Sequence, residues 1–230
     1  MLLYLHGFTS GPQSVKARAL GARMAERGLA ADFVCPQLSA SPAEAILQAE
    51  QIIEHARKVG AGETATNVAN DVANDVANGT TNNTTNNTTN NALKHPNILL
   101  VGSSLGGFYA TVLAEKHNLN AVLINPAVIG QLPMEGFIGT HQWLYTGEPF
   151  EFTAQHIAEL RAMDLPRVTN PQRFWLMLEE GDETLDYRQA VAYYAGAKQT
   201  VLTGGDHTFT RWADYLDAVI DASLTGRLAD

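Results

Sequence analysis

The chain has 230 residues, of which 45% are hydrophobic, and its formal net charge is −9. This length and composition suit a single globular domain with an ordinary core. The acidic balance and the lack of clustered Lys and Arg argue against nucleic acid or an anionic membrane surface as a partner. The single cysteine, Cys35, excludes an intrachain disulfide and a CxxC metal site.

The beginning of the chain does not match a secretory signal. A basic segment, a long apolar stretch and a small-residue cleavage site are all missing from it. The longest apolar run in the sequence is also far shorter than the roughly 18 residues of a membrane span. We therefore expect a soluble protein of the cytoplasm.

The first third of the chain predicts two strands and two helices. An apolar strand at residues 2–5 is followed by an amphipathic helix at 14–27, which ends at a glycine. A second strand covers residues 32–34. Ser41 and Glu44 have the spacing of a capping box, so a second helix is expected from there to about residue 59.

Residues 61–95 differ in composition from the rest of the chain. Val-Ala-Asn-Asp repeats give way to Thr-Thr-Asn-Asn repeats, with almost no large apolar residue to bury. Asn and Thr side chains also compete with regular backbone hydrogen bonding. The composition predicts a disordered surface insertion in a single domain of residues 1–230. We expect it to be neutral for function, because a long surface loop adds little closure entropy.

The remaining sequence again alternates apolar runs with helical patterns. Strands are expected at 98–101, 121–124, 174–178 and 200–202, and helices at 107–117, 186–195 and 210–223. Residues 127–172 interrupt this rhythm with aromatic residues, glycines and prolines, and they indicate a small lid of short helices. Six strands alternating with helices predict an α/β fold with a mostly parallel six-stranded sheet covered on both faces.

Gly102-Ser103-Ser104-Leu105-Gly106 matches the G-x-S-x-G pattern of a nucleophile elbow. The pattern is weak by itself in a chain with 19 glycines. Its context strengthens it, because an apolar strand comes directly before it and a helix-forming run after it. Ser104 would stand at a helix N-terminus, where the helix dipole favours developing negative charge. On the motif alone, a glycine-rich turn that packs closely without chemistry remains an equal alternative.

His207 is the candidate general base. A serine hydroxyl becomes a nucleophile when a base removes its proton, and that base needs a carboxylate to orient it. His207 follows the last expected strand, and it is the only one of seven histidines that lies downstream of every candidate acid. This position agrees with the chain order serine, acid, histidine. A lone surface histidine is the alternative interpretation.

The acid is expected in the loop after the preceding strand, which reads Glu179-Glu180-Gly181-Asp182-Glu183. Asp182 is favoured because it follows a glycine at the carboxyl end of that strand. Asp186 is better explained as a helix N-cap. Asp206 adjoins His207 and would point elsewhere in most backbones. The alternatives that stay open are Glu179, Glu183 and Asp186.

The oxyanion of an acyl-transfer intermediate requires two backbone N–H donors. One is expected from Leu105, which follows the nucleophile, and the other from Phe8 in the His6-Gly7-Phe8 turn after the first strand. A tight turn that only needs Gly7 is the alternative. His6 is expected to brace this loop rather than to titrate in the reaction.

Substrate contacts are expected from the same turn and from the aromatic residues near the lid. We assign Gly7, Phe137, Trp143 and Tyr145 to substrate binding. The aromatic side chains between residues 137 and 152 suit an acyl pocket, and they suit ordinary packing under a cap equally well.

Seven segments of the chain carry a resemblance to a known family. They are Leu3-Tyr4-Leu5-His6-Gly7-Phe8, Gly102-Ser103-Ser104-Leu105-Gly106-Gly107, Ile124-Asn125-Pro126-Ala127, Tyr145-Thr146-Gly147, Gly181-Asp182-Glu183, residues 185–194 and residues 204–209. Taken together they resemble the small bacterial YqiA-type esterases, over nearly the whole chain outside residues 61–95. This resemblance implies an α/β-hydrolase fold and esterase activity on short acyl esters, or on long-chain acyl-CoA thioesters. It also implies Ser104, Asp182 and His207 as the catalytic triad. The low-complexity insertion departs from the family pattern.

The sequence thus predicts a serine esterase or thioesterase that acts on a small-molecule substrate without a metal or an organic cofactor. Two alternatives remain. One is different chemistry on the same fold, such as carbon–carbon bond hydrolysis or peptide cleavage, because a fold does not determine a reaction. The other is a non-catalytic binding protein, which an intact set of Ser, Asp and His disfavours. A flavodoxin-like nucleotide site would need a glycine-rich phosphate loop after the first strand, and His6-Gly7-Phe8-Thr9 is not one.

Overall fold

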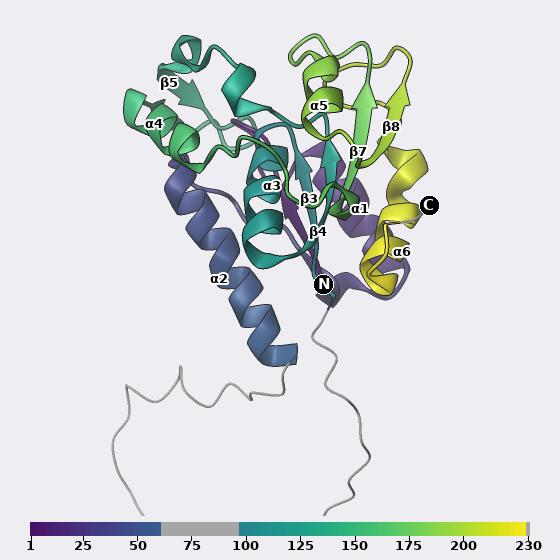
Figure 1. The fold of residues 1–230 in the computed structure, drawn as a ribbon. Helices are drawn as coiled ribbons and strands as arrows, with labels where there is room; N and C mark the ends of the chain where they lie inside the picture. Colours follow the sequence, from purple (N-terminus) through teal and green to yellow (C-terminus); the bar gives the residue numbers. More distant parts are fainter. Residues whose placement is uncertain (61–96, 229–230) are drawn as a thin grey trace, which may run out of the picture.

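A computed structural model describes residues 1–60 and 97–228 of the chain (Figure 1). The predicted insertion at residues 61–95 lies outside the described residues. The central sheet has six strands in the order β2-β1-β3-β4-β7-β8, and every neighbouring pair is parallel. The expected sheet is thereby confirmed. Its strands are β1 (Leu2–Leu5), β2 (Phe33–Val34), β3 (Leu99–Ser103), β4 (Asn120–Ile124), β7 (Phe174–Glu179) and β8 (Lys198–Leu202).

Helices cover both faces of this sheet. α2, α3, α4 and α5 contribute to the core on one face, and α1 and α6 to the core on the other. The short last helix begins later than expected, because residues 212–215 form a 3-10 turn before it. The helices are α1 (Val15–Glu26), α2 (Pro42–Gly60), α3 (Leu105–His117), α4 (Ala154–Met163), α5 (Tyr187–Tyr193) and α6 (Leu216–Thr225).

The apolar runs of the sequence form strands because both of their faces are buried. In β1, Leu3 and Leu5 belong to the core under α2 and α3, whereas Leu2 and Tyr4 belong to the core under α1 and α6. All four side chains are at most 1% exposed. A parallel strand that is covered on both faces reads as a continuous apolar run.

Residues 127–172 contain an antiparallel hairpin, which the sequence analysis did not predict. Its strands are β5 (Gly139–Gln142) and β6 (Pro149–Phe152), and α4 follows it. The hairpin turn is attached to the loop after β1, because Leu144 N–H donates a hydrogen bond to the Thr9 carbonyl at 2.7 Å. This attachment brings the hairpin over the end of the sheet where β1 stops.

The candidate catalytic residues lie at the edge of the sheet formed by the carboxyl ends of its parallel strands. Ser104 follows β3, Asp182 follows β7 and His207 follows β8. Open parallel sheets place their ligand sites at this edge. No helix among residues 1–60 and 97–228 is long and apolar enough to cross a membrane.

Candidate active site

Ser104 occupies a sharp turn between β3 and α3. Its backbone angles are φ 56° and ψ −122°, a region that L-residues rarely adopt. The turn is possible because glycines flank it. A Cβ on Gly102 would lie 2.2 Å from the Gly106 carbonyl oxygen, and a Cβ on Gly106 would lie 2.1 Å from the Leu5 carbonyl oxygen. The G-x-S-x-G spacing is therefore a steric requirement of this turn.

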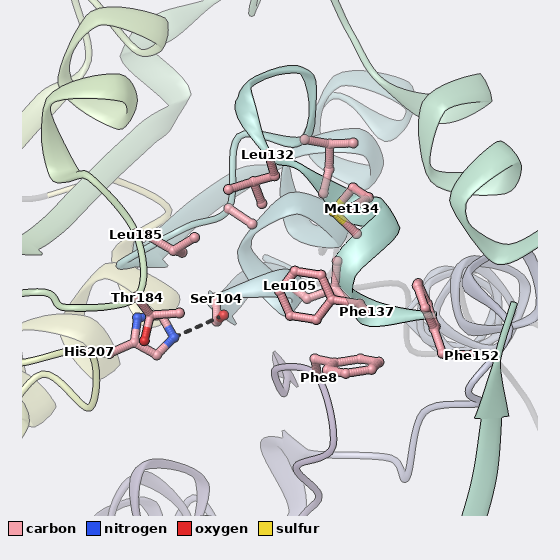
Figure 2. A pocket seen from close by; sticks show the side chains of 12 residues that line it. Phe8, Ser104, Leu105, Leu132, Met134, Phe137, Phe152, Thr184, Leu185 and His207 are labelled. Atoms are coloured by element: carbon pink, nitrogen blue, oxygen red, sulfur yellow. Dashed lines mark hydrogen bonds between the residues drawn. The ribbon is translucent and has the colours of Figure 1, made fainter. Parts of the chain in front are cut away.

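Ser104, His207 and Asp182 form a continuous chain of hydrogen bonds. The Ser104 Oγ lies 3.1 Å from His207 Nε2, and His207 Nδ1 lies 2.8 Å from Asp182 Oδ2 (Figure 2). Because a carboxylate only accepts, the proton belongs on Nδ1, and Nε2 is left free to accept the proton of the serine hydroxyl. The structure thus brings together the three residues chosen from the sequence.

The Asp182 carboxylate accepts backbone hydrogen bonds in addition to its hydrogen bond with His207. Its Oδ1 accepts backbone N–H groups from Thr184 at 2.9 Å and Leu185 at 2.8 Å. The Asp182 side chain is only 1% exposed, whereas the His207 side chain is 22% exposed. The orienting carboxylate is therefore held away from water, while the imidazole reaches the open site.

The other candidate acids have different partners. Asp186 caps α5, with its side chain accepting Arg188 N–H at 3.1 Å, as the N-cap interpretation predicted. Glu183 accepts the backbone N–H of His207 at 3.0 Å rather than the imidazole. Glu179 lies at the end of β7 and points into the loop that carries His207.

Glu179 anchors that loop, a role that the sequence analysis did not assign. Its carboxylate is fully buried and accepts N–H groups from Asp206 at 2.8 Å and Thr210 at 3.0 Å. Arg211 Nε donates to it at 3.0 Å as an ion pair. Burial alone would raise the pKa of this carboxyl, but the hydrogen bonds from Asp206, Arg211 and Thr210 outweigh burial and hold the pKa below its usual value.

Asn125 links the same loop to the end of β7. Its side-chain amide donates to the carbonyls of Asp206 at 3.1 Å and His207 at 3.2 Å, and its Oδ1 accepts Glu179 N–H at 3.1 Å. Asn125 is buried and has a positive φ of 41°. Its place directly after an apolar strand was the only available sequence signal for this role.

Lys16, which lies in α1, supports the loop that carries His207. Its Nζ donates to the Thr208 carbonyl at 2.8 Å. Burial lowers the pKa of this ammonium to about 8, although Asp206 and Asp182 nearby oppose the shift. Anchors from α1, β4 and β7 therefore all converge on the segment around His207.

The turn after β1 approaches the serine closely. A Cβ on Gly7 would lie 3.2 Å from the Ser104 Cβ, so only a small residue lets the backbone come this near. Phe8 and Leu105 line the same cavity as Ser104. Leu105 is also the first residue of α3, so its N–H has no acceptor within the helix. The roles of these two N–H groups as oxyanion donors stay predictions.

A cavity of about 230 Å³ opens beside Ser104 (Figure 2). Phe137 lines it, as predicted, but most of its wall comes from apolar residues that the sequence analysis did not single out. Of the described side chains that line it, the polar ones are Ser104, Thr184 and His207. The apolar ones are Phe8, Leu105, Ala127, Ile129, Leu132, Met134, Phe137, Phe152 and Leu185.

Trp143 and Tyr145 are not among the residues that line this cavity, and their assignment to substrate binding stays a prediction. Trp143 packs on Phe150, with ring centroids 4.5 Å apart, and meets His6 edge-on. It lines a smaller cavity of about 20 Å³, whose wall also includes Phe8 and Leu105. Tyr145 lies at the hairpin turn and is 41% exposed. Both residues lie between β5 and β6 in the hairpin.

His6 braces the first loop, as expected. Its ring is 3% exposed, and its Nε2 accepts Leu38 N–H at 3.0 Å while Nδ1 donates to the Gly7 carbonyl at 2.9 Å. Burial lowers the pKa of this imidazole below its ordinary value. In the described part of the chain, no three His, Cys, Asp or Glu side chains are grouped closely enough to hold a metal ion.

These features define an α/β-hydrolase fold with a serine at its nucleophile elbow. The chain belongs to the family described as uncharacterised protein family UPF0227, which matches residues 1–62 and 80–223. The match covers every segment on which the resemblance to YqiA-type esterases rests, and solved structures of hydrolases share the fold.

Three solved structures illustrate the likeness of the fold. Mouse alpha/beta hydrolase domain-containing protein 10 is 18% identical with a TM-score of 0.61, over 98% of this chain and 89% of the mouse chain. Est1E from Butyrivibrio proteoclasticus is 13% identical with a TM-score of 0.56, over 97% and 86%. The esterase domain of a Rhodothermus marinus protein is 16% identical with a TM-score of 0.56, over 98% and 85%. At these identities the likeness concerns the fold.

Proposed function

We propose that the protein is a serine hydrolase that cleaves carboxylic esters, with Ser104 as nucleophile, His207 as general base and Asp182 as the residue that orients the base. The observation that carries this proposal is the unbroken hydrogen-bond chain from Ser104 through His207 to Asp182. Two further features support it: the strained turn at Ser104 and the apolar cavity that opens beside it.

The first step is acylation of the serine. Ser104 Oγ attacks the ester carbonyl carbon while His207 Nε2 takes the hydroxyl proton, and Asp182 stabilises the imidazolium that forms. The negative charge moves to the carbonyl oxygen, where the N–H groups of Phe8 and Leu105 receive it. Collapse of this intermediate breaks the bond to the leaving oxygen, and His207 donates to that oxygen the proton that it took from Ser104.

The second step frees the acid. His207 removes a proton from a water molecule, which attacks the acyl carbon, and Ser104 leaves with that proton. The same steps open a thioester, so acyl thioesters belong to the proposed substrate class.

We place the reaction in the cytoplasm, where the half-buried thiol of Cys35 stays reduced.

The test is hydrolysis of p-nitrophenyl butyrate by the wild-type protein and by Ser104→Ala, with fluorophosphonate labelling of both. We expect wild-type activity and labelling, and the loss of both in the variant. Ser103→Ala is the matched control, because Ser103 is the neighbouring buried serine at the end of β3. A folded wild-type protein that is neither active nor labelled would overturn the proposal and favour a binding protein on this fold.

A substrate panel separates ester hydrolysis from other reactions of this fold. A peptide p-nitroanilide and a vinylogous 1,5-diketone would report peptidase and carbon–carbon hydrolase activity. Turnover of either with a higher kcat/KM than any ester, still dependent on Ser104, would keep the nucleophile and overturn the assigned substrate.

A further inference from the structure

We infer that the cavity beside Ser104 is an acyl site built for an unbranched chain of medium length, and that Met134 at its wall sets the upper limit. This inference rests on the proposed function and deepens it. It assigns one side of the site to the acyl group, and it assigns chain-length selectivity to a named side chain.

The direction of the acyl group follows from the position of the base. His207 must return its proton to the leaving oxygen, so the leaving group lies on the His207 side of the serine. Figure 2 shows His207 and Thr184 on one side of Ser104, and Phe8, Phe137 and Phe152 on the other. The apolar part of the cavity therefore faces the acyl half of an ester.

The composition of the cavity wall favours an alkyl chain. The polar lining side chains, Ser104, Thr184 and His207, all lie near the reacting atoms. The aromatic rings present their edges and faces to one another, with Phe8 and Phe152 at 5.1 Å and Phe8 and Phe137 at 5.8 Å between centroids. A polar substituent on a bound acyl group would have no side-chain partner among these described residues, which disfavours it.

The length of the chain follows from the volume. An apolar cavity of about 150 Å³ accommodates benzene, so a cavity of about 230 Å³ accommodates an apolar group of about eight or nine carbons. We therefore expect an optimum at an acyl group of about eight carbons. Up to that limit, kcat/KM is expected to rise about threefold to fourfold for each added methylene that the wall buries.

Met134 and Leu132 provide the wall positions at which this limit can be changed. Met134 belongs to the 3-10 turn Met134–Phe137 and is 5% exposed, and Leu132, which precedes it in the chain, also lines the cavity (Figure 2). Shortening Met134 removes three heavy atoms from the wall, whereas enlarging Leu132 fills the cavity. The two substitutions should move the optimum in opposite directions.

The experiment measures kcat/KM for p-nitrophenyl esters with acyl groups from acetyl to palmitoyl, and for a feruloyl ester. We expect a wild-type optimum near octanoyl, a shift of about two to three carbons toward longer chains in Met134→Ala, and a shift toward butanoyl in Leu132→Trp. Ile138→Ala is the matched control, because Ile138 lies in the same segment, is 49% exposed and does not line the cavity. Its profile should match the wild type.

The outcomes separate this inference from the proposed function. Fluorophosphonate labelling with an optimum at acetyl or palmitoyl, a preference for feruloyl over octanoyl, or an unmoved optimum in both wall variants overturns the acyl site alone. Because truncation of a buried Met can destabilise the fold, Leu132→Trp gives a decision even if Met134→Ala does not fold. No labelling and no hydrolysis by folded wild-type protein overturns the proposed function and the acyl site together.

Discussion

The carboxylate of Glu179 and the guanidinium of Arg211 form an ion pair at 3.0 Å, in which the Glu179 side chain is completely buried. The pair joins the end of β7 to the loop that carries His207. Removing one partner of a buried pair leaves the other uncompensated, and this is much more costly than losing a surface pair. Substitution of Glu179 therefore tests whether the position of the His207 loop depends on this ion pair.

We expect Glu179→Gln to lower the free energy of unfolding by about 3 kcal/mol and to lower kcat as well. The neutral amide cannot accept from Arg211, Asp206 and Thr210 together, so the histidine loop loosens. Urea unfolding and p-nitrophenyl ester hydrolysis measure the two effects. Glu180→Gln is the control, because Glu180 is exposed, and it should change stability by less than about 0.5 kcal/mol. Equal stability of the two variants would contradict the anchor role.

If the proposed triad operates, Asp182→Asn is expected to lower kcat by roughly 10⁴-fold, as loss of the correct tautomer does in Ser-His-Asp hydrolases. An amide at this position donates to His207 Nδ1 and moves the imidazole proton to Nε2, which can then no longer accept from Ser104. Stopped-flow or long-time ester assays measure the residual rate. Glu183→Gln is the comparison, because Glu183 contacts only the backbone N–H of His207. A similar loss in both variants would assign the effect to loop geometry instead of proton transfer.

Gly106→Ala is expected to prevent formation of the elbow. Its new Cβ would lie 2.1 Å from the Leu5 carbonyl oxygen, which is backbone and cannot move aside cheaply. We expect a largely insoluble or inactive protein, measured as soluble yield and as fluorophosphonate labelling. Gly136→Ala provides the contrast, because a Cβ there meets nothing within 4 Å. A soluble, labelled Gly106→Ala protein would show that β1 and α3 are less tightly packed than described.

His6 should make stability decrease as the pH falls below about 6.5. Burial lowers the pKa of its imidazole below the ordinary value of 6.5. As the pH falls below 6.5, the unfolded chain takes up a proton that the folded protein refuses, so stability is lost, by at most about 1.4 kcal/mol for each pH unit from one proton. Urea unfolding at pH 7.5, 6.5 and 5.5 measures this loss. His6→Asn should be less stable at pH 7.5 but show a shallower slope, and an identical slope would contradict the prediction.

Deleting residues 62–92 is expected to leave kcat/KM within about twofold of the full-length value, because long surface loops contribute little to folding free energy. The described residues on either side of the gap support this. α2 ends at Gly60 and β3 begins at Leu99, at the edge of the sheet opposite the carboxyl ends where Ser104 and His207 lie (Figure 1). The ester assay and thermal unfolding of both proteins provide the test. A large loss of activity would mean that the insertion contributes to the site.

The sheet and the three central site residues were predictable for physical reasons. Strands buried on both faces appear as continuous apolar runs, and parallel strands deliver the residues that follow them to one edge. The hairpin at residues 139–152 was not predictable in this way. Its strands are half-exposed and carry polar residues such as Thr140 and Gln142, so neither an apolar run nor a clear alternation identifies them.

The contacts that support the site were also beyond the reach of sequence patterns. Glu179 was considered only as a possible acid, because its partners Asp206, Thr210 and Arg211 lie 27 to 32 residues away. Asn125 binds residues 81 and 82 positions later in the chain. The positions of Trp143 and Tyr145 depend on the hairpin, which the sequence patterns did not reveal. The roles of Phe8 and Leu105 as donors stay predictions until an intermediate analogue is bound.

Asn125 holds three groups that come from two different strand ends: the carbonyls of Asp206 and His207, and the N–H of Glu179. The segment that carries His207 is therefore already ordered by these hydrogen bonds when the chain folds. Substrate binding then costs little further conformational entropy in this segment. The distance from His207 to Ser104 is already set before each turnover. The polar side of the site, around Ser104 and His207, is rigid. The selectivity of an inhibitor will therefore depend on how well its shape fits the apolar side of the cavity.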